Sequence, residues 1–481
     1  MSGRSSTGAG NARNWPDLRL SAALAVAKVS AVGIRRLGRG GGTSAPGVLA
    51  NRIDPSLLTK LSARLPSGAI VVAGTNGKTT TARMIADILE SGGHAVIHNR
   101  SGSNLVRGVV AAFADEASLG GHPGGDVGVI ETDEAAFPDV VRLARPRIIL
   151  LNNLFRDQLD RYGELDTISK RWRAALAHLD ERTTVVVNGD DPALAQMTEG
   201  LAAKRATFGL NETQHRLEAL PHAADAATCR ACGVDLHYDA LYLSHLGDWR
   251  CPSCDRARPP LELIGGEIEL RGVESLAMTV RRADDGALRL EVGVPGLYNA
   301  YNVLAATAVA RVAGIADETI VAALAAFRSA FGRIERVTYQ GRTLTLALVK
   351  NPVGFNEVLR MLTAATGGLT VPTLIAINDL YADGRDVSWL WDVDFELLAD
   401  GTAPLSTTGL RGADMANRLK YAGIGDDRLR PLSSDLTDGL DAFLASVPEG
   451  GSAYVLPTYT AMLDLRRTLT ERGAVETFWR Q

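Results

Sequence analysis

A glycine-rich segment that starts at Gly74 has the residue types and spacing that bind a phosphate group. It follows the apolar run Ala69–Val72, which is typical of a buried parallel strand, and leads into a helical pattern from Lys78. A strand, a glycine loop and a helix N-terminus together direct backbone N–H groups at an anion. Lys78 would reach the β- and γ-phosphates of a nucleotide, and the Thr79 hydroxyl would hold Mg²⁺. The predicted phosphate-binding residues are Gly74, Thr75, Asn76, Gly77, Lys78, Thr79 and Thr80.

One position departs from the common phosphate-loop pattern G-x-x-x-x-G-K-[ST]. That pattern has glycine where this chain has Val72, so the shorter form Gly74–Thr80 is what the sequence offers. The alternative is a chance glycine-rich turn between a strand and a helix. The apolar run before the loop and the helical pattern after it favour phosphate binding.

Short apolar runs and helical patterns alternate after the loop, which predicts an α/β fold with a parallel sheet covered on both faces. We expect strands at residues 95–97, 126–130, 147–151 and 184–187. Ligands bind at the carboxyl ends of such strands. Glu131 is therefore the first candidate for a carboxylate ligand of Mg²⁺, whereas Asp133 and Glu134 are equally compatible with solvated surface charge. Lys170, on the helix before the last of these strands, is by itself typical of a surface lysine.

The four cysteines form two C-x-x-C pairs, Cys229 with Cys232 and Cys251 with Cys254, separated by 18 residues. This spacing is typical of a Cys₄ zinc site, and four thiolates close the coordination sphere, so the expected zinc is structural. Disulfides are the alternative, which an intracellular compartment disfavours. We expect a zinc ribbon at about residues 225–258, inserted in the larger domain. If all four thiols bind zinc, the chain by itself is not a cysteine-dependent glutaminase.

Composition limits the classes of function. Hydrophobic residues make up 46% and charged residues 22% of the chain, as in soluble globular proteins. The net charge of −4 and the lack of a long basic run give no reason to expect nucleic acid. Residues 20–34 come closest to a membrane span but contain Lys28, and they lack the features of a signal peptide. We therefore expect an amphipathic helix there, and a cytoplasmic protein.

Three regions are expected in the 481 residues. Residues 1–49 comprise a disordered start, a helix over about 16–37, and a glycine-rich connector over 38–47 that is either a flexible linker or a ligand-facing loop. Residues 50–336 form the nucleotide-binding domain, in which Asn299 and Asn302 share one face of a helix start. Residues 337–481 form a second, Rossmann-like α/β domain without the dinucleotide fingerprint.

The sequence resembles the Mur ligases, ATP-dependent enzymes of peptidoglycan synthesis that join an amine to a carboxylate through an acyl phosphate. Besides the phosphate loop, the resemblance rests on Glu131, residues 153–160, Lys170, residues 188–191, Asn299, Asn302 and Gly332–Arg333. In that family the lysine that matches Lys170 is often carbamylated and helps to bind a second Mg²⁺, and the sequence leaves the state of Lys170 open. The resemblance also implies that Asn188 and Asp191 lie near the adenosine of ATP and Arg333 near its phosphates, with Asn299 as a further nucleotide-binding residue.

Departures from the Mur ligase pattern point to a subgroup. Mur ligases usually have Asp-His where this chain has Asp157–Gln158, and Asp-Tyr-Ala-His-Asn-Pro where it has Ala347–Pro352. Their UDP-substrate domain and amino-acid-binding signature also have no counterpart. The chain resembles the MurT family, the synthetase subunits of lipid II isoglutaminyl synthase, from about residue 15 onward. This resemblance is carried by the four cysteines and by residues 99–104, 152–160, 378–386 and 459–463.

The MurT resemblance implies ATP-dependent amidation of the α-carboxylate of D-glutamate in the lipid II stem peptide, at the inner face of the plasma membrane. Ammonia would come from a GatD-type glutaminase subunit in a heterodimer and would displace phosphate from an acyl phosphate. Either Asp383 or Asp386 would complete the partner's Cys–His pair, unless these residues only cap helices or form salt bridges. The implied cofactors are ATP, Mg²⁺ and a structural Zn²⁺.

Two other functions are compatible with parts of the sequence. A ligase that adds an amino acid, as other Mur and folylpolyglutamate ligases do, would need an amino-acid pocket whose signature the last domain lacks. A zinc-bearing scaffold that only docks a partner is disfavoured because a complete set of catalytic candidates is present. That set is Lys78, Thr79, Glu131 and Lys170.

Overall fold

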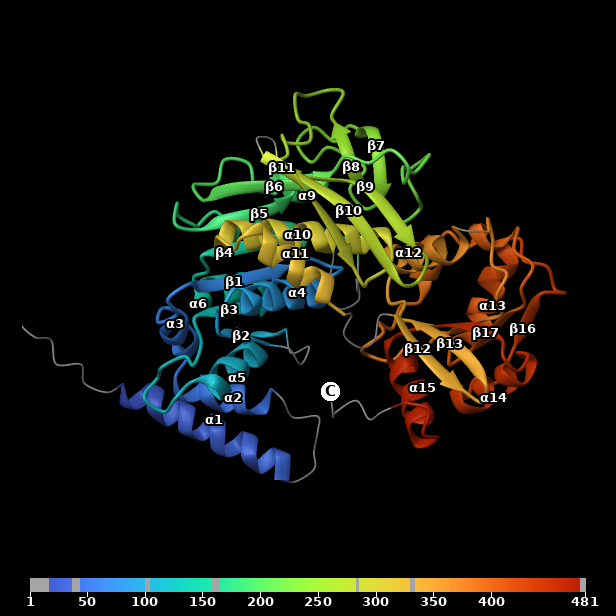
Figure 1. Ribbon diagram of the computed structural model, residues 1–481, viewed down its shortest axis with the longest axis horizontal. Helices are drawn as coiled ribbons and strands as arrows, with labels where there is room; N and C mark the ends of the chain where they lie inside the picture. The colour runs from blue at the N-terminus through green and yellow to red at the C-terminus, as the bar shows by residue number, and fades with distance from the viewer. Residues whose placement is uncertain are drawn as a thin grey trace, which may run out of the picture.

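The computed structural model describes residues 17–36, 44–99, 104–156, 165–282, 285–328, 334–364 and 366–475. A central α/β domain carries the N-terminal helices below it, and a C-terminal α/β domain lies beside it (Figure 1). The α/β class predicted from the sequence is confirmed. Within the described ranges, none of the helices has the length and apolar character needed to cross a membrane.

In the described part of the chain, nine strands form the central sheet in the order β11-β10-β9-β6-β5-β4-β1-β3-β2. Neighbouring strands from β2 to β9 are parallel, while β9, β10 and β11 form an antiparallel meander. The strands are β1 Gly68–Ala73, β2 Val96–His98, β3 Val127–Glu131, β4 Ile148–Leu151, β5 Thr184–Asn188, β6 Lys204–Leu210, β9 Leu263–Arg271, β10 Ser275–Arg282 and β11 Asp285–Val292. The phosphate loop follows β1, which lies between β3 and β4.

Successive residues of β1 face opposite sides of the sheet, as the period of a strand requires. Ile70 and Val72 belong to the hydrophobic cluster on one face, and Ala69 and Val71 to the cluster on the other. The helices that contribute to the first cluster are α4 Lys78–Ser91, α10 Leu297–Ala313 and α11 Asp317–Ala326. Those that contribute to the second are α1 Leu18–Arg36, α2 Ala45–Ile53, α3 Leu57–Ser62, α5 Val106–Glu116, α6 Phe137–Ala144, α8 Leu165–Leu176 and α9 Pro192–Met197.

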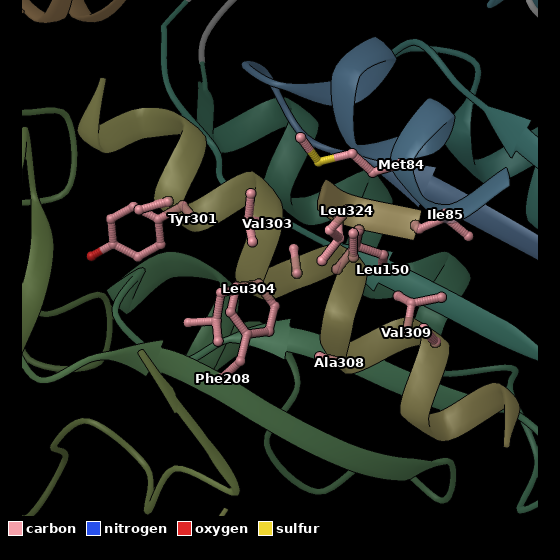
Figure 2. Close-up of a cluster of buried hydrophobic side chains, with 14 of the residues drawn as sticks. Met84, Ile85, Leu150, Phe208, Tyr301, Val303, Leu304, Ala308, Val309 and Leu324 are labelled. Carbon is pink, nitrogen blue, oxygen red and sulfur yellow. The ribbon is translucent and has the colours of Figure 1, made fainter. Parts of the chain in front are cut away.

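Figure 2 shows the first of these clusters, in which α10 packs both on the sheet and against α4. Its Leu304 lies near Phe208 of β6, and Leu150 of β4 lies near Leu324 of α11. The same helix begins beside the phosphate loop, so the packing of α10 on the sheet positions its first turn for the site.

In the described residues of the C-terminal domain, six strands form a sheet in the order β12-β13-β17-β14-β15-β16. All neighbours are parallel except β12 and β13. The strands are β12 Ile334–Tyr339, β13 Arg342–Ala347, β14 Thr373–Ala376, β15 Leu405–Thr408, β16 Leu429–Pro431 and β17 Ser452–Pro457. The helices and 3₁₀ turns are α12 Pro352–Thr363, η1 Ser388–Asp392, η2 Phe395–Leu398, α13 Gly412–Tyr421, α14 Leu436–Ser446 and α15 Tyr459–Glu471.

The N-terminal region packs on the central domain through α1 (Leu18–Arg36) and α2 (Ala45–Ile53). The start of α2 shortens the expected connector, because residues 45–47 are helical rather than part of a linker. Pro46 in its first turn explains this start, since proline presets the helical φ there. The disordered start expected for residues 1–14 and the connector up to residue 43 lie outside the described residues.

Leu150→Ala tests the importance of the buried central sheet. Leu150 is fully buried, so we expect the substitution to lower the free energy of unfolding by about 2–5 kcal/mol through lost burial and an unfilled cavity. Leu119→Ala is the control, because Leu119 is 54% exposed and should change that free energy by about 0.5 kcal/mol or less. Urea unfolding measures the free energy of unfolding of both variants. Equal midpoints would contradict the placement of Leu150 in the buried core of the central sheet.

Candidate active site

The phosphate loop joins β1 to α4 through two glycines with positive φ, 157° at Gly74 and 82° at Gly77. Only glycine fits at position 77, because a Cβ there would lie 2.0 Å from Oδ1 of Asn302. Lys78 begins α4, so the loop and the helix N-terminus form the junction predicted from the sequence. Such a junction presents backbone N–H groups to an anion.

Asn153, which follows β4, holds the loop backbone. Its side-chain oxygen accepts hydrogen bonds from the backbone N–H of Thr75 (3.1 Å) and Asn76 (2.8 Å), and its Nδ2 donates to the carbonyl of Asn76 (3.0 Å). The Thr75 hydroxyl donates to the carbonyl of Phe155 at 3.1 Å and accepts from its N–H at 3.0 Å. The residues that follow β4 therefore fix the backbone of the first half of the loop through hydrogen bonds.

A chain of buried amides continues from the loop to the start of α10. Oδ1 of Asn302 accepts from Nδ2 of Asn152 at 3.0 Å and from the Thr81 hydroxyl at 3.1 Å, while its Nδ2 donates to Oδ1 of Asn299 at 2.9 Å. Asn299 in turn donates to the carbonyl of Pro295 at 2.7 Å. Asn299 and Asn302 thus share a face, as their spacing predicts, and that face touches the phosphate loop.

Two carboxylates meet the first turn of α4. The Thr79 hydroxyl donates to Oε1 of Glu131 at 3.0 Å, and Nζ of Lys78 lies 3.0 Å from Oε1 of Glu134. Asn99 fixes Glu131 by pairing with both its backbone N–H and its carbonyl, at 2.9 and 2.8 Å. Asp133 and Glu134 are 6% and 5% exposed, so the structure excludes solvated surface charge for both.

Asn188 and Asp191 lie beneath the site and are fully buried. Nδ2 of Asn188 donates to the carbonyl of Asn152 at 2.9 Å, and Asp191 accepts from the N–H of Leu154 at 2.8 Å while capping α9. Asp190, which directly precedes Asp191, is also buried, and this burial raises its pKa to about 6. These contacts show Asn188 and Asp191 bracing the segment after β4 from inside the protein.

Other predicted residues are separate from this cluster or outside the described residues. Lys170 is exposed on α8, and two residues later Trp172 donates from its indole nitrogen to the carbonyl of Glu134 at 2.8 Å. Arg333 lies outside the described residues, as do Asp157, Gln158 and Asp160.

The four cysteines converge at one point. Their sulfur atoms all lie within 4.8 Å of one another, with Sγ–Sγ distances of 3.4 Å for Cys232–Cys251 and 3.7 Å for Cys229–Cys254. A tetrahedral zinc with Zn–S bonds of about 2.3 Å requires sulfur separations of roughly 3.8 Å. The cluster therefore fits one Zn²⁺, and no disulfide joins these cysteines.

The segment between the cysteine pairs is a hairpin of β7 (His237–Leu243) and β8 (Leu246–Arg250) that docks beside β5. The Trp249 indole donates to the carbonyl of Gly189 at 3.0 Å, and the N–H of Gly247 to the carbonyl of Asp190 at 3.0 Å. The His245 ring contacts the Phe155 ring, with centroids 4.9 Å apart and the ring planes tilted by 55°. The metal cluster and the phosphate loop are thereby linked through the chain after β4 and β5.

A pocket beside the phosphate loop lies between the two domains. The loop supplies Asn76 and Gly77 to its wall, α10 supplies Tyr298, Tyr301 and Asn302, and the hairpin tip supplies Leu243 and Leu246. The C-terminal domain closes it with residues 348–358, and Nδ2 of Asn351 donates to Oδ1 of Asn76 at 2.9 Å. Sequence reasoning missed this wall. The only signal for it was the run of apolar residues in 240–246 between the cysteine pairs.

Asp383 and Asp386 follow β14 in the C-terminal domain and have different surroundings. Asp383 is 5% exposed, and burial raises its pKa. Its carboxylate accepts a hydrogen bond at 2.8 Å from the backbone N–H of Thr460, which lies in the first turn of α15. Asp386 is exposed and accepts from the N–H of Ser388 at 2.8 Å, a contact that lowers its pKa. The first carboxylate anchors a helix, whereas the second faces solvent in its ionised form.

Comparison with solved structures shows the Mur ligase fold. The pseudomurein peptide ligase type C from Methanothermus fervidus is 17% identical with a TM-score of 0.65, covering 84% of this chain and 78% of that one. MurF ligase from Thermotoga maritima, solved in complex with ADP, is 13% identical with a TM-score of 0.61, covering 90% of this chain and 86% of that one.

Sequence comparison identifies the subgroup of Mur ligases to which the chain belongs. Residues 72–232 match the Mur ligase middle domain, and residues 348–462 match the MurT ligase C-terminal domain. The lipid II isoglutaminyl synthase (glutamine-hydrolyzing) subunit MurT of Streptococcus pneumoniae is 30% identical over 466 residues, covering 95% of this chain and 99% of that protein. Its Staphylococcus aureus (strain COL) counterpart is 29% identical, covering 85% and 89%. The chain therefore belongs to the MurT family of Mur ligases.

Proposed function

We propose that this protein amidates the α-carboxylate of D-glutamate in the lipid II stem peptide, using ATP and ammonia from a GatD-type glutaminase subunit. The observation that carries the proposal is the contact of Thr79 with Glu131 on a phosphate loop that borders the interdomain pocket. The MurT relatives are subunits of a glutamine-hydrolyzing lipid II isoglutaminyl synthase, which supports the lipid II substrate and the link to glutamine hydrolysis.

The residues of the loop fit ATP with Mg²⁺. The Thr79 hydroxyl and the Glu131 carboxylate are hard oxygen donors, the type that Mg²⁺ prefers, and they lie 3.0 Å apart. Bound Mg²⁺ would neutralise charge on the β- and γ-phosphates. Lys78 adds a nearly buried positive charge at the same place, and burial strengthens its attraction for phosphate. We place the adenosine part of ATP beside Tyr298, Leu243 and Leu246, because the lining of this pocket is mainly apolar.

The reaction proceeds in two steps on the substrate. An oxygen of the glutamate carboxylate attacks the γ-phosphorus in line, and the bond from that phosphorus to ADP breaks. The nitrogen of ammonia then attacks the acyl carbon, phosphate leaves, and the nitrogen loses a proton to give the amide. The protein contributes mainly by positioning the reactants and neutralising charge, as in phosphoryl transfer generally.

The cysteine cluster supports an external source of ammonia. The chain has four cysteines, and all four lie in the cluster that fits Zn²⁺. A cysteine held as a metal ligand is not available as the nucleophile that releases ammonia from glutamine. The nucleophile therefore belongs to another subunit, for which the GatD-type glutaminase is our candidate.

Asp386 is the better candidate to complete the partner's Cys–His pair. Its exposure allows another subunit to reach the carboxylate, whereas Asp383 is buried against α15. Exposed apolar side chains surround this edge of the domain, as expected of a docking surface. They are Leu380 (43% exposed), Tyr381 (71%), Leu410 (54%), Tyr459 (44%) and Leu463 (42%).

Mass spectrometry of lipid II tests the proposed reaction. The chain would be incubated with lipid II, ATP and Mg²⁺, in one tube with an ammonium salt and in another with mixed amino acids. We expect conversion of the carboxylate to an amide only with ammonium, with ADP formed in step. A peptide lengthened by an amino acid would instead make this a ligase of the ordinary Mur type. If both tubes show no change, adding the glutaminase and glutamine decides between a partner-dependent synthetase and a scaffold.

Lys78→Ala should reduce ammonium-dependent amidation by about 10²–10³-fold, because a charge aimed at the transferred phosphate is lost. Lys204→Ala removes an exposed lysine on β6 and should leave the rate unchanged. Rates of ADP release and of lipid II amidation measure both variants. Equal rates for the two would refute the role of Lys78.

Asp386→Asn should separate the two activities of the complex. We expect glutamine hydrolysis by the heterodimer to fall on the order of 10²–10⁴-fold, since a histidine loses the carboxylate that orients it. Amidation supplied directly with ammonium should stay at the wild-type rate. Asp383→Asn is the matched variant, and its main effect should be a lower melting temperature. If Asp386→Asn leaves glutamine hydrolysis intact, the partner uses another residue.

Cys232→Ser tests the metal site. Elemental analysis of the wild-type chain should find about one zinc per molecule, because four thiolates complete one tetrahedral shell. The variant should contain less zinc and melt at a lower temperature. Ser253→Ala changes an exposed neighbour between Cys251 and Cys254 and should preserve both properties. A metal-free wild-type protein with an unchanged melting temperature after chelation would argue against zinc.

A further inference from the structure

Helix α1 is apolar on two opposite faces. The face packed on the central domain carries the buried residues Leu20, Ala23, Leu24 and Ala27. The opposite face carries four exposed aliphatic residues, here called the outer stripe: Leu18 (76% exposed), Val26 (37%), Val29 (73%) and Val32 (42%). A surface helix normally presents polar residues on its solvent side. The outer stripe therefore lacks the polar side chains that contact with water would favour.

The outer stripe is continuous along the helix. Its members are spaced by eight, three and three residues, which places them on one side of α1 over about 21 Å. Exposed Ala22 lies between Leu18 and Val26, so no charged residue interrupts the row. In Figure 1, α1 is the outermost helix on its side of the central domain, and the C-terminal domain lies elsewhere. A flat surface can thus approach the whole stripe.

The stripe lies in a basic environment. The side chains described in residues 17–34 and 44–53 include three basic residues and one acidic residue, a net charge of +2, in a chain whose net charge is −4. The basic residues are Arg19, Lys28 and Arg52. The single acid, Asp17, is already paired with Lys60 at 2.6 Å. Aliphatic side chains flanked by positive charge suit the interface of an anionic lipid layer.

Charge also decides between a lipid surface and a second copy of the chain. Two copies packed stripe against stripe would bring two patches of charge +2 together, and like charges oppose that contact. Anionic headgroups instead neutralise the basic residues while the acyl boundary receives the aliphatic ones.

We propose that α1 docks the protein on anionic membranes, with the outer stripe inserted at the headgroup boundary. This docking lies beyond the amidation reaction and is independent of it, because it needs neither ATP nor the stem peptide. It would hold the protein at the surface of a bilayer through one face of a helix whose other face is fixed to the central domain.

Flotation of the full chain with lipid vesicles tests the proposal. Vesicles of phosphatidylcholine with about 30% phosphatidylglycerol should carry the wild-type protein upward at low salt, and pure phosphatidylcholine vesicles should carry at least about tenfold less. Raising the salt to 0.5 M should weaken binding, since it screens the charge of the basic residues. Val29→Asp should reduce binding about tenfold or more, because it places a carboxylate in the stripe.

Leu220→Asp is the control, because it puts the same charge on an exposed leucine outside α1 and should leave flotation unchanged. Melting temperatures verify that both variants fold, which the 73% exposure of Val29 favours. The proposal is overturned if the wild type stays at the bottom with anionic vesicles, or if Val29→Asp floats as well as the wild type. A wild-type dimer in light scattering that Val29→Asp dissociates would assign the stripe to a second copy instead.

Discussion

Amide side chains hold the backbone of the phosphate loop, and the geometry of the site depends on these buried hydrogen bonds. Asn153 binds the first half of the loop from the end of β4, and Asn302 meets the close approach at Gly77 from α10. Asn351 reaches Asn76 from the C-terminal domain. Hydrogen bonds of this kind are strong in a low-dielectric interior and costly to leave unmade. The loop is therefore determined jointly by the sheet, α10 and the second domain.

The cysteine-bearing hairpin is part of the same unit. Trp249 and Gly247 bind backbone carbonyls of the turn after β5, and that turn also carries Asp191, which braces the chain after β4. The apolar tip of the hairpin, Leu243 and Leu246, reaches the interdomain pocket. A metal that closes the cluster at the base of the hairpin would thus also support the wall of the interdomain pocket.

Among the described residues, side-chain ion pairs join the two domains outside the pocket. Arg336 pairs with Glu274 at 3.1 Å, Arg156 lies 3.4 Å from Asp392, and His222 lies 3.0 Å from Asp394. Partly exposed pairs of this type contribute little free energy because water and salt screen them. Apolar contacts cross between the domains in both directions, because Val353 of α12 belongs to a cluster of the central domain and Val273 of the central domain packs against a C-terminal cluster.

Local sequence alone determined the elements and the donor types. The strand–glycine–helix pattern predicted the phosphate loop, and the spacing of the cysteines predicted their convergence. The i, i+3 spacing placed Asn299 beside Asn302. Each of these features depends on residues that lie close together in the sequence. Tertiary structure decided the rest. It buried Asp133 and Glu134, enclosed Asn188 and Asp191, and distinguished Asp383 from Asp386. It also brought residues 243–246 and 348–358 to one pocket. Burial and contacts between distant segments follow from how sheets and helices pack, which no local pattern records.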